Sequence, residues 1–218
     1  TSGRNGSLRL WDIASGIELH TFDEQILYFT SAAFSRNGQM IVTGSIDGSA
    51  HLWDATNGIE IRRFEGHTQS INSVAFSSDG QTILTGSEDN TARLWDATNN
   101  RHVRRFEGHV LDVSDVTFSP DGQMVLTTEG YGTARLFDAN TGIEVRRFEG
   151  HTSNVYAAAF SPDAQLIATG GEDNARLWNV ATGAEVRSFE GVEGQVRDIA
   201  FSPDGRLIIL ASGDTVEM

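Results

Sequence analysis

The amino-acid sequence predicts an all-β fold built from about five repeated four-stranded antiparallel units, and three observations predict it. The 23 glycines fall at regular intervals rather than in one tract, which is typical of tight turns between short strands. A phenylalanine that opens an F-S-x-x-G or F-S-x-x-A turn recurs every 41 or 42 residues, at Phe34, Phe76, Phe118, Phe160 and Phe201. An aromatic residue followed by Asp or Asn recurs with the same spacing, at Trp11-Asp12, Trp53-Asp54, Trp95-Asp96, Phe137-Asp138 and Trp178-Asn179.

One complete repeat shows how each unit is built. Short apolar runs alternate with turn residues, and we expect strands over 71–76, 81–86, 91–95 and 101–106. The turns between them fall at Asp79-Gly80, Asp89-Asn90 and Asn99-Asn100. No helical stripe of useful length appears. Four antiparallel strands in about 42 residues make one blade of a β-propeller, so we expect residues 1–218 to form a single propeller domain.

Charge and cysteine content narrow the classes of partner. The formal net charge is −14, so the surface as a whole repels phosphate backbones and anionic lipid, and we expect neither nucleic acid nor a membrane as a partner. Three Arg pairs recur in step, but alternate residues of a strand face opposite sides, so only one Arg of each pair can share a surface. The chain has no cysteine and no apolar run of membrane-spanning length, and we expect a cytoplasmic protein.

The sequence resembles the WD-repeat (WD40) family over essentially its whole length. The resemblance rests on the Gly-His pair, the S-P-D-G turn and the terminal Trp-Asp, which recur together in register. It implies a ring of blades around a central channel and, in most members, no enzymatic site. Nearly identical repeats, such as LWDATNGIEIRRFEGH and LFDANTGIEVRRFEGH, are similar to those of bacterial multi-repeat members, in which the propeller is often a sensor attached to an effector domain.

The resemblance also implies a structural tetrad in each blade. A His before the first strand, a Ser or Thr on the second, an Asp in the next turn and a Trp on the third satisfy one another's hydrogen bonds. Two blades contain the complete set, at His67, Thr85, Asp89 and Trp95 and at His151, Thr169, Asp173 and Trp178.

The other blades depart from this pattern. Gln25 stands at the His position of the first blade, and in the last repeat Val192 and Leu210 replace the His and the hydroxyl residue, while Asp214 remains. In the third blade, Tyr131 replaces the Asp and Phe137 replaces the Trp. We therefore expect the third blade to be held more by packing than by hydrogen bonds.

Partner-binding residues follow from the same resemblance. In the family, contact positions fall three and five residues past the His position and just before the tetrad Asp. Here they are Tyr28, Thr30, Ser70, Asn72, Glu88, Asp112, Ser114, Asn154, Tyr156, Glu172, Gln195 and Arg197. Tyr28, Tyr156 and Arg197 stand out, because Tyr and Arg are enriched in binding hot spots.

The leading interpretation is a scaffold or sensor module that binds protein or peptide partners on a propeller face and is not an enzyme. The alternative is a propeller hydrolase or lyase with its site at the central channel. No nucleophile elbow or phosphate-binding loop is present, and each recurring His has a tetrad role, so we expect no catalytic residue, cofactor or metal.

The two ends of the chain carry the same part of a repeat. Residues 1–5 align with residues 210–214, so the ends overlap instead of abutting. We expect a fragment of a larger propeller rather than a self-contained five-bladed ring. An open array leaves strand edges, so ring completion or edge pairing with another chain is expected.

Overall fold

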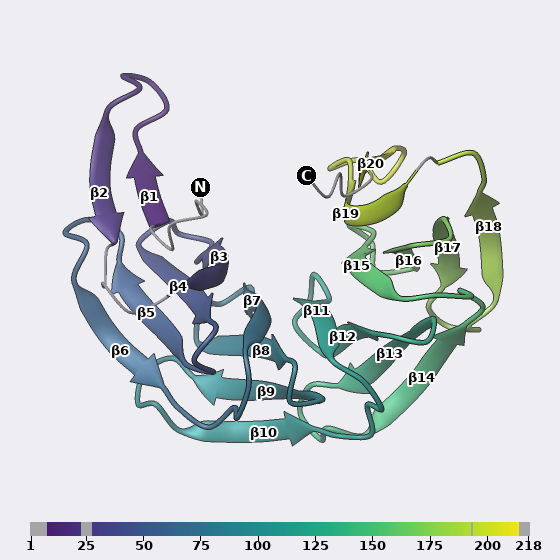
Figure 1. Ribbon diagram of the computed structural model, residues 1–218, viewed down its shortest axis with the longest axis horizontal. Helices are drawn as coiled ribbons and strands as arrows, with labels where there is room; N and C mark the ends of the chain where they lie inside the picture. Colours follow the sequence, from purple (N-terminus) through teal and green to yellow (C-terminus); the bar gives the residue numbers. More distant parts are fainter. Residues whose placement is uncertain (1–7, 23–27, 193, 214–218) are drawn as a thin grey trace, which may run out of the picture. The chain divides into compact units, whose positions relative to one another are not determined.

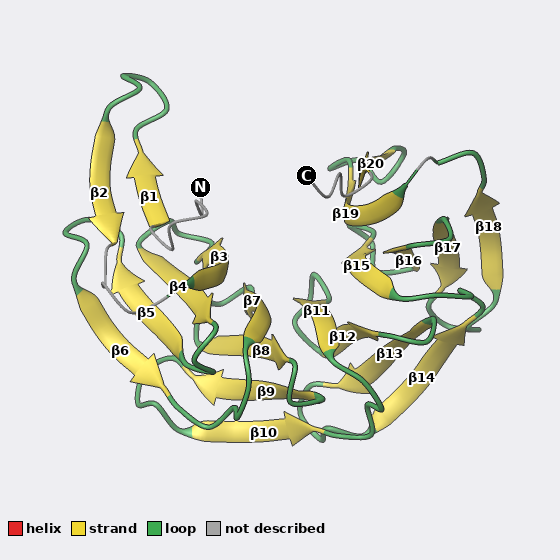
Figure 2. Cartoon of the chain, in the orientation of Figure 1, coloured by secondary structure: helices red, strands yellow, loops and turns green. Residues whose placement is uncertain are grey.

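Every regular element of the chain is a β-strand in the part that the structure describes (Figure 2). This structure is a computed structural model, and it describes residues 8–22, 28–192 and 194–213. The chain divides into two compact units, which we call unit 1 (residues 1–105) and unit 2 (residues 106–218). The all-β fold class and the repeated antiparallel blades predicted from the sequence are confirmed.

Unit 1 contains one two-stranded hairpin and two four-stranded antiparallel sheets (Figure 1). The hairpin is β1 (Leu8–Trp11) with β2 (Glu18–Phe22). The first sheet is β3 (Phe29–Phe34), β4 (Met40–Ser45), β5 (Ala50–Asp54) and β6 (Glu60–Phe64). The second sheet is β7 (Ile71–Phe76), β8 (Thr82–Ser87), β9 (Thr91–Asp96) and β10 (His102–Phe106). The four strands of the second sheet lie within one residue of the expected ranges.

Unit 2 contains two four-stranded sheets and a final hairpin (Figure 1). The first sheet is β11 (Val113–Phe118), β12 (Met124–Glu129), β13 (Thr133–Asp138) and β14 (Glu144–Glu149). The second sheet is β15 (Val155–Phe160), β16 (Leu166–Gly171), β17 (Ala175–Asn179) and β18 (Glu185–Phe189). The hairpin is β19 (Gln195–Phe201) with β20 (Ile208–Gly213).

Turn chemistry explains why the strands end where they do. In the β7–β10 sheet the three turns contain Gly80, Asn90 and Asn100 at φ 69°, 62° and 62°. This left-handed conformation is open to Gly and costs Asn less than other side chains. The carboxylate of Asp79 also accepts hydrogen bonds from the Ser77 hydroxyl (2.6 Å) and the Gln81 N–H (2.9 Å), which closes the first turn.

Neighbouring sheets within each unit are joined by an aromatic pair. The Phe that ends the fourth strand of one sheet packs on the Trp of the third strand of the next. Ring centroids lie 5.3 Å apart for Phe22 and Trp53, 5.8 Å for Phe64 and Trp95, and 5.9 Å for Phe148 and Trp178. All six rings are at least 96% buried. Each such pair therefore fixes one sheet against the following one.

Candidate functional site

A continuous chain of hydrogen bonds crosses the β7–β10 sheet. The Trp95 indole N–H donates to the Thr85 hydroxyl oxygen (3.0 Å), which lies 2.7 Å from His67 Nε2. On its other side, His67 Nδ1 lies 2.8 Å from the Asp89 carboxylate, which also accepts the Thr68 N–H at 3.1 Å. The four residues expected at His67, Thr85, Asp89 and Trp95 thus lie within hydrogen-bond distance of one another, and each buried polar group has a partner.

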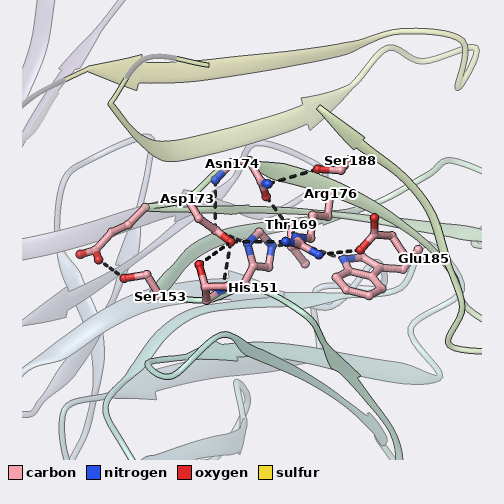
Figure 3. A network of polar contacts seen from close by, with 11 residues as sticks. His151, Ser153, Thr169, Asp173, Asn174, Arg176, Glu185 and Ser188 are labelled. Carbon is pink, nitrogen blue, oxygen red and sulfur yellow. Dashed lines mark hydrogen bonds and ion pairs between the residues drawn. The ribbon is translucent and has the colours of Figure 1, made fainter. Parts of the chain in front are cut away.

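The same arrangement recurs in the β15–β18 sheet (Figure 3). Thr169 Oγ1 accepts the Trp178 N–H at 2.8 Å and lies 2.7 Å from His151 Nε2, and His151 Nδ1 lies 2.6 Å from Asp173. Arg176 extends this network, because its guanidinium lies 3.5 Å from Asp173. The residue deleted before Trp178 does not disturb the set, since β16 and β17 keep an unbroken register.

Burial sets the protonation of these groups. Burial lowers the pKa of the His67 and His151 imidazoles, and it outweighs the opposing effect of the hydrogen bonds that these rings donate to Asp89 and Asp173. Burial also raises the pKa of the Asp89 carboxyl, but hydrogen bonds from His67 and Thr91 outweigh it and hold that pKa below its ordinary value. Each set therefore contains a neutral imidazole beside an ionised carboxylate at neutral pH.

Acidification is expected to destabilise the blades in two stages. Below the ordinary His pKa of 6.5 the unfolded chain binds more protons than the folded chain, so stability falls as the pH falls. Below the ordinary Asp pKa of 3.8 the lowered carboxyl pKa adds a second loss. Urea unfolding between about pH 8 and about pH 2 measures both stages. The His151→Gln variant should lose less stability on acidification than the wild type, and an equal loss would contradict the buried neutral His.

The β11–β14 sheet lacks the turn Asp and the Trp, and Phe137 packs on the His109 ring with centroids 5.5 Å apart. The sheet also contains polar contacts that the sequence did not predict. Glu129 and Arg135, only 2% and 3% exposed, form an ion pair with Nε and Oε1 2.6 Å apart. The second Glu129 oxygen accepts the Val110 N–H at 2.8 Å, as Asp89 and Asp173 accept the equivalent N–H in their sheets. A carboxylate on the second strand has replaced the carboxylate in the turn, and Tyr131 is 76% exposed.

The β3–β6 sheet carries a different substitution. Gln25 lies outside the described residues, as does Asp214. The fully buried His51 stands where other repeats have Arg, with its ring stacked on Trp53 at 5.7 Å. Its nitrogens lie 2.8 Å from the Ser49 hydroxyl and 3.0 Å from Glu60. The Trp53 N–H still donates to Thr43 (3.0 Å). Sequence reasoning missed both residues, although His51 stands where the other repeats have Arg and Glu129 stands where they have Ser or Gly.

The predicted contact positions share a backbone feature that the sequence did not reveal. The first strand of every sheet and of the final hairpin contains a register shift that leaves one residue bulged out of the ladder. The bulged residues are Thr30, Asn72, Ser114, Tyr156 and Arg197. A bulge turns a side chain away from the regular alternation and is common beside binding sites. Five of the twelve predicted residues therefore occupy equivalent, re-aimed positions.

The structure brings five of the twelve together in unit 2. The Arg197 guanidinium lies over the Tyr156 ring, 5.6 Å from its centroid, and donates to Gln195 at 2.6 Å. Glu172 accepts hydrogen bonds from the Tyr156 hydroxyl, from Asn154 Nδ2 (3.3 Å) and from the Ser153 hydroxyl. We call Ser153, Asn154, Tyr156, Glu172, Gln195 and Arg197 the bulge cluster.

Electrostatics within the bulge cluster follow from these contacts. Burial and the hydrogen bond to Glu172 raise the pKa of the Tyr156 phenol. Hydrogen bonds from Ser153 and Tyr156 lower the pKa of the Glu172 carboxyl. Glu172 thus stays charged, with its charge spread over three donors, and Tyr156 stays a neutral donor.

The other predicted contact residues lie at or just before the start of a first strand, or just after the end of a second strand. The Thr30 hydroxyl lies within hydrogen-bond distance of the carbonyl oxygens of Gly44 (3.0 Å) and Ile71 and can donate its single proton to either. Tyr28 is 53% exposed. The Glu88 N–H donates to the Ser70 carbonyl at 2.9 Å, and Asp112 is exposed, whereas Ser70, Asn72, Glu88 and Ser114 are half-buried.

Two searches bear on other kinds of site. Among residues 8–22, 28–192 and 194–213, no group of three or more His, Asp or Glu side chains is arranged to hold a metal ion. Within the same ranges no helix is long and apolar enough to cross a membrane.

Comparison with protein families agrees with the geometry. The family model described as "WD domain, G-beta repeat" matches five times, over residues 16–54, 58–96, 100–138, 142–179 and 183–216. A search of curated proteins gave no match. WD-repeat proteins generally act as scaffolds for protein–protein interaction and are usually not enzymes. Since the five matches cover most of the sequence, this chain belongs to the WD-repeat family.

Proposed function

We propose that this chain is a cytoplasmic scaffold or sensor module that binds protein or peptide partners through the bulge cluster of unit 2. The observation that carries the proposal is the Arg197 guanidinium stacked on Tyr156, with both residues on β-bulges of adjacent first strands. Stacked Arg and Tyr side chains are typical binding anchors because they offer a large, ordered contact area. The cytoplasmic location rests on the cysteine-free sequence.

The bulge cluster favours a partner that carries a carboxylate. Arg197 is exposed and uses one N–H on Gln195, and among the described residues no carboxylate lies in ion-pair distance of its guanidinium. Its other N–H groups can donate to a partner. Glu172 already accepts three hydrogen bonds and holds Tyr156 in place. Arg197 would therefore bind the acidic group of a peptide, while the Tyr156 ring supplies apolar contact.

Peptides selected on the wild-type chain from a random displayed library test this proposal. Tyr156→Ala and Arg197→Ala should each weaken the selected peptides at least about tenfold, because each removes an anchor worth more than about 1 kcal/mol. Calorimetric titration measures the affinity, and thermal unfolding should give the same Tm for both variants and the wild type.

Arg206→Ala is the matched control, because Arg206 is exposed in the turn at the other end of β19. It should leave peptide affinity unchanged. If Tyr156→Ala and Arg197→Ala bind as tightly as Arg206→Ala, the bulge cluster is not the binding site.

We also infer that this chain pairs through its sheet edges with another chain. Within the described residues, β1 pairs with β2 alone and β20 pairs with β19 alone, whereas every other sheet has four strands. Among the described strands, β1 and β20 each have a neighbour on one side only, and a strand edge of this kind favours the addition of a further strand.

A further inference from the structure

Three apolar residues of the β11–β14 sheet stand where the two sheets with a complete tetrad have polar ones. They are Val110, Leu111 and Tyr131, and we call them the apolar rim. The equivalent residues are Thr68, Gln69 and Asp89 in the β7–β10 sheet and Thr152, Ser153 and Asp173 in the β15–β18 sheet. Val110 is 66% exposed and Tyr131 is 76% exposed, so these substitutions place apolar surface in contact with solvent.

The backbone of Tyr131 is strained. Its φ of 58° is in the left-handed region, which is costly for a side chain of this size, whereas the equivalent Asp47 and Asp89 keep negative φ. Burial of the ring does not offset the strain, because the ring is mostly exposed. Strained residues are concentrated at sites where they contact a ligand. The conformation of Tyr131 therefore points to a role in binding and not in folding.

The other two members of the apolar rim lie beside this turn. The Val110 N–H (2.8 Å) and the Leu111 N–H (3.5 Å) both lie against the carboxylate of Glu129, two residues before Tyr131. Leu111 Cδ1 occupies the space that a Cβ on Gly130 would fill. The loop before β11 thus rests on the β12–β13 turn, and the glycine makes this close approach possible.

The apolar rim is continuous with the bulge cluster. The side-chain oxygen of Asn154 lies 3.0 Å from the same Cβ position on Gly130. Asn154 Nδ2 donates to Glu172 (3.3 Å), which also accepts the Tyr156 hydroxyl, and Arg197 lies over the Tyr156 ring. The apolar rim and the bulge cluster therefore meet at Gly130, and both belong to unit 2.

We propose that the apolar rim and the bulge cluster form one surface for a peptide that carries both an acidic and an apolar residue. The proposal rests on the function proposed above and adds a second determinant to it. The acidic residue binds the Arg197 guanidinium, and the apolar residue packs on Tyr131 and Val110. Burying these exposed side chains removes apolar surface from water, and the Tyr131 ring offers a broad, ordered contact area.

The packing of the sheets sets the spacing of the two determinants. Strand β11 lies beside β15, and β15 lies beside β19. Packed sheets are about 10 Å apart, so the apolar rim and Arg197 are separated by roughly 20 Å. An extended chain advances about 3.3 Å per residue. The acidic and the apolar residue should therefore lie about six positions apart in an extended peptide.

The peptides selected on the wild-type chain from the random displayed library test this proposal. When aligned, they should share an acidic and an apolar residue at about this spacing. Tyr131→Asn should weaken their binding at least about fivefold in calorimetric titrations. Its Tm should equal or exceed that of the wild type, because Asn tolerates the left-handed conformation better than Tyr does. A residue with only a structural role would not lose affinity while gaining stability.

Val110→Ser has a matched control in Ile143→Ser. Both residues are β-branched and 66% exposed on the same sheet, but Ile143 lies in the β13–β14 turn at the opposite end. Val110→Ser should weaken the selected peptides, and Ile143→Ser should leave their affinity unchanged. Equal affinities for the two variants would contradict a contact at the apolar rim.

Double-mutant cycles assign each determinant to its partner residue. Changing the apolar peptide residue to Ala should weaken binding to the wild type but add little in Tyr131→Asn. Changing the acidic peptide residue to Ala should behave in the same way with Arg197→Ala. Additive losses in both cycles would overturn the proposed placement of the peptide.

The variants also separate this proposal from the one on which it rests. If Arg197→Ala loses affinity and Tyr131→Asn does not, the apolar rim is not part of the site, and the bulge cluster keeps its role. If Tyr131→Asn loses affinity and Arg197→Ala does not, the joint surface is wrong. A library that yields no binding peptide would contradict both proposals.

Discussion

Replacing Arg135 with Met is expected to lower the free energy of unfolding by about 3–5 kcal/mol, because it leaves the Glu129 carboxylate buried without its counter-charge. The Arg135 guanidinium lies 2.6 Å from Glu129 and 2.8 Å from Glu144, and both Glu129 and Arg135 are almost fully buried. Urea unfolding of the whole chain measures the change.

Arg147→Met is the control on the same sheet. Arg147 also pairs with Glu144, but its side chain is 49% exposed, so its loss should cost no more than about 1 kcal/mol. Adding Glu129→Gln to Arg135→Met removes the orphaned charge and should restore part of the stability. Similar costs for Arg135→Met and Arg147→Met would show that the ion pair does not replace the missing turn Asp.

Thr169→Val is expected to destabilise the protein about twice as much as Thr127→Val. Thr169 serves both the Trp178 N–H (2.8 Å) and His151 Nε2 (2.7 Å), so valine leaves two buried polar groups without a partner. Thr127 serves His109 Nε2 (2.8 Å), and its sheet has Phe137, which has no N–H to satisfy. At roughly 1–3 kcal/mol for each orphaned group, the expected costs are about 3–4 and about 1.5–2 kcal/mol.

The comparison uses the same substitution at equivalent positions, since Thr127 and Thr169 are both fully buried on second strands. Denaturation midpoints of the two variants and the wild type measure the difference. Equal losses would mean that the indole hydrogen bond adds nothing to the stability of a blade.

The strands were predictable because alternating apolar residues and left-handed turn residues act locally. In the β7–β10 sheet the expected ranges agree with the structure to within one residue. The replacement of the turn Asp by Glu129 was not predictable in the same way. The sequence pattern places a carboxylate in the turn, whereas Glu129 lies on β12, opposite Thr133 and beside the strand that carries Arg135. A usable signal existed, because Glu129 stands where other repeats have Ser87 and Gly171.

The bulge cluster was predictable only in part. Tyr156 and Arg197 were chosen by position and residue type, but they lie 41 residues apart and meet because β15 packs beside β19. The bulges that turn them outward depend on the pairing register of two strands, which local sequence does not determine. Ser153 was not predicted, because its contact with Glu172 arises only when the loop before β15 folds over the β16–β17 turn.

If the buried residues of the blades stabilise the fold and the bulge cluster binds partners, one variant should lose only affinity and another only stability. Library-selected peptides are titrated into the wild type, Arg197→Ala and Thr169→Val, and Tm is measured for each. Arg197→Ala should lose at least about tenfold in affinity with an unchanged Tm, whereas Thr169→Val should lower Tm and, while folded, bind as the wild type does. Unchanged affinity in Arg197→Ala would contradict the assignment of this face as the binding site.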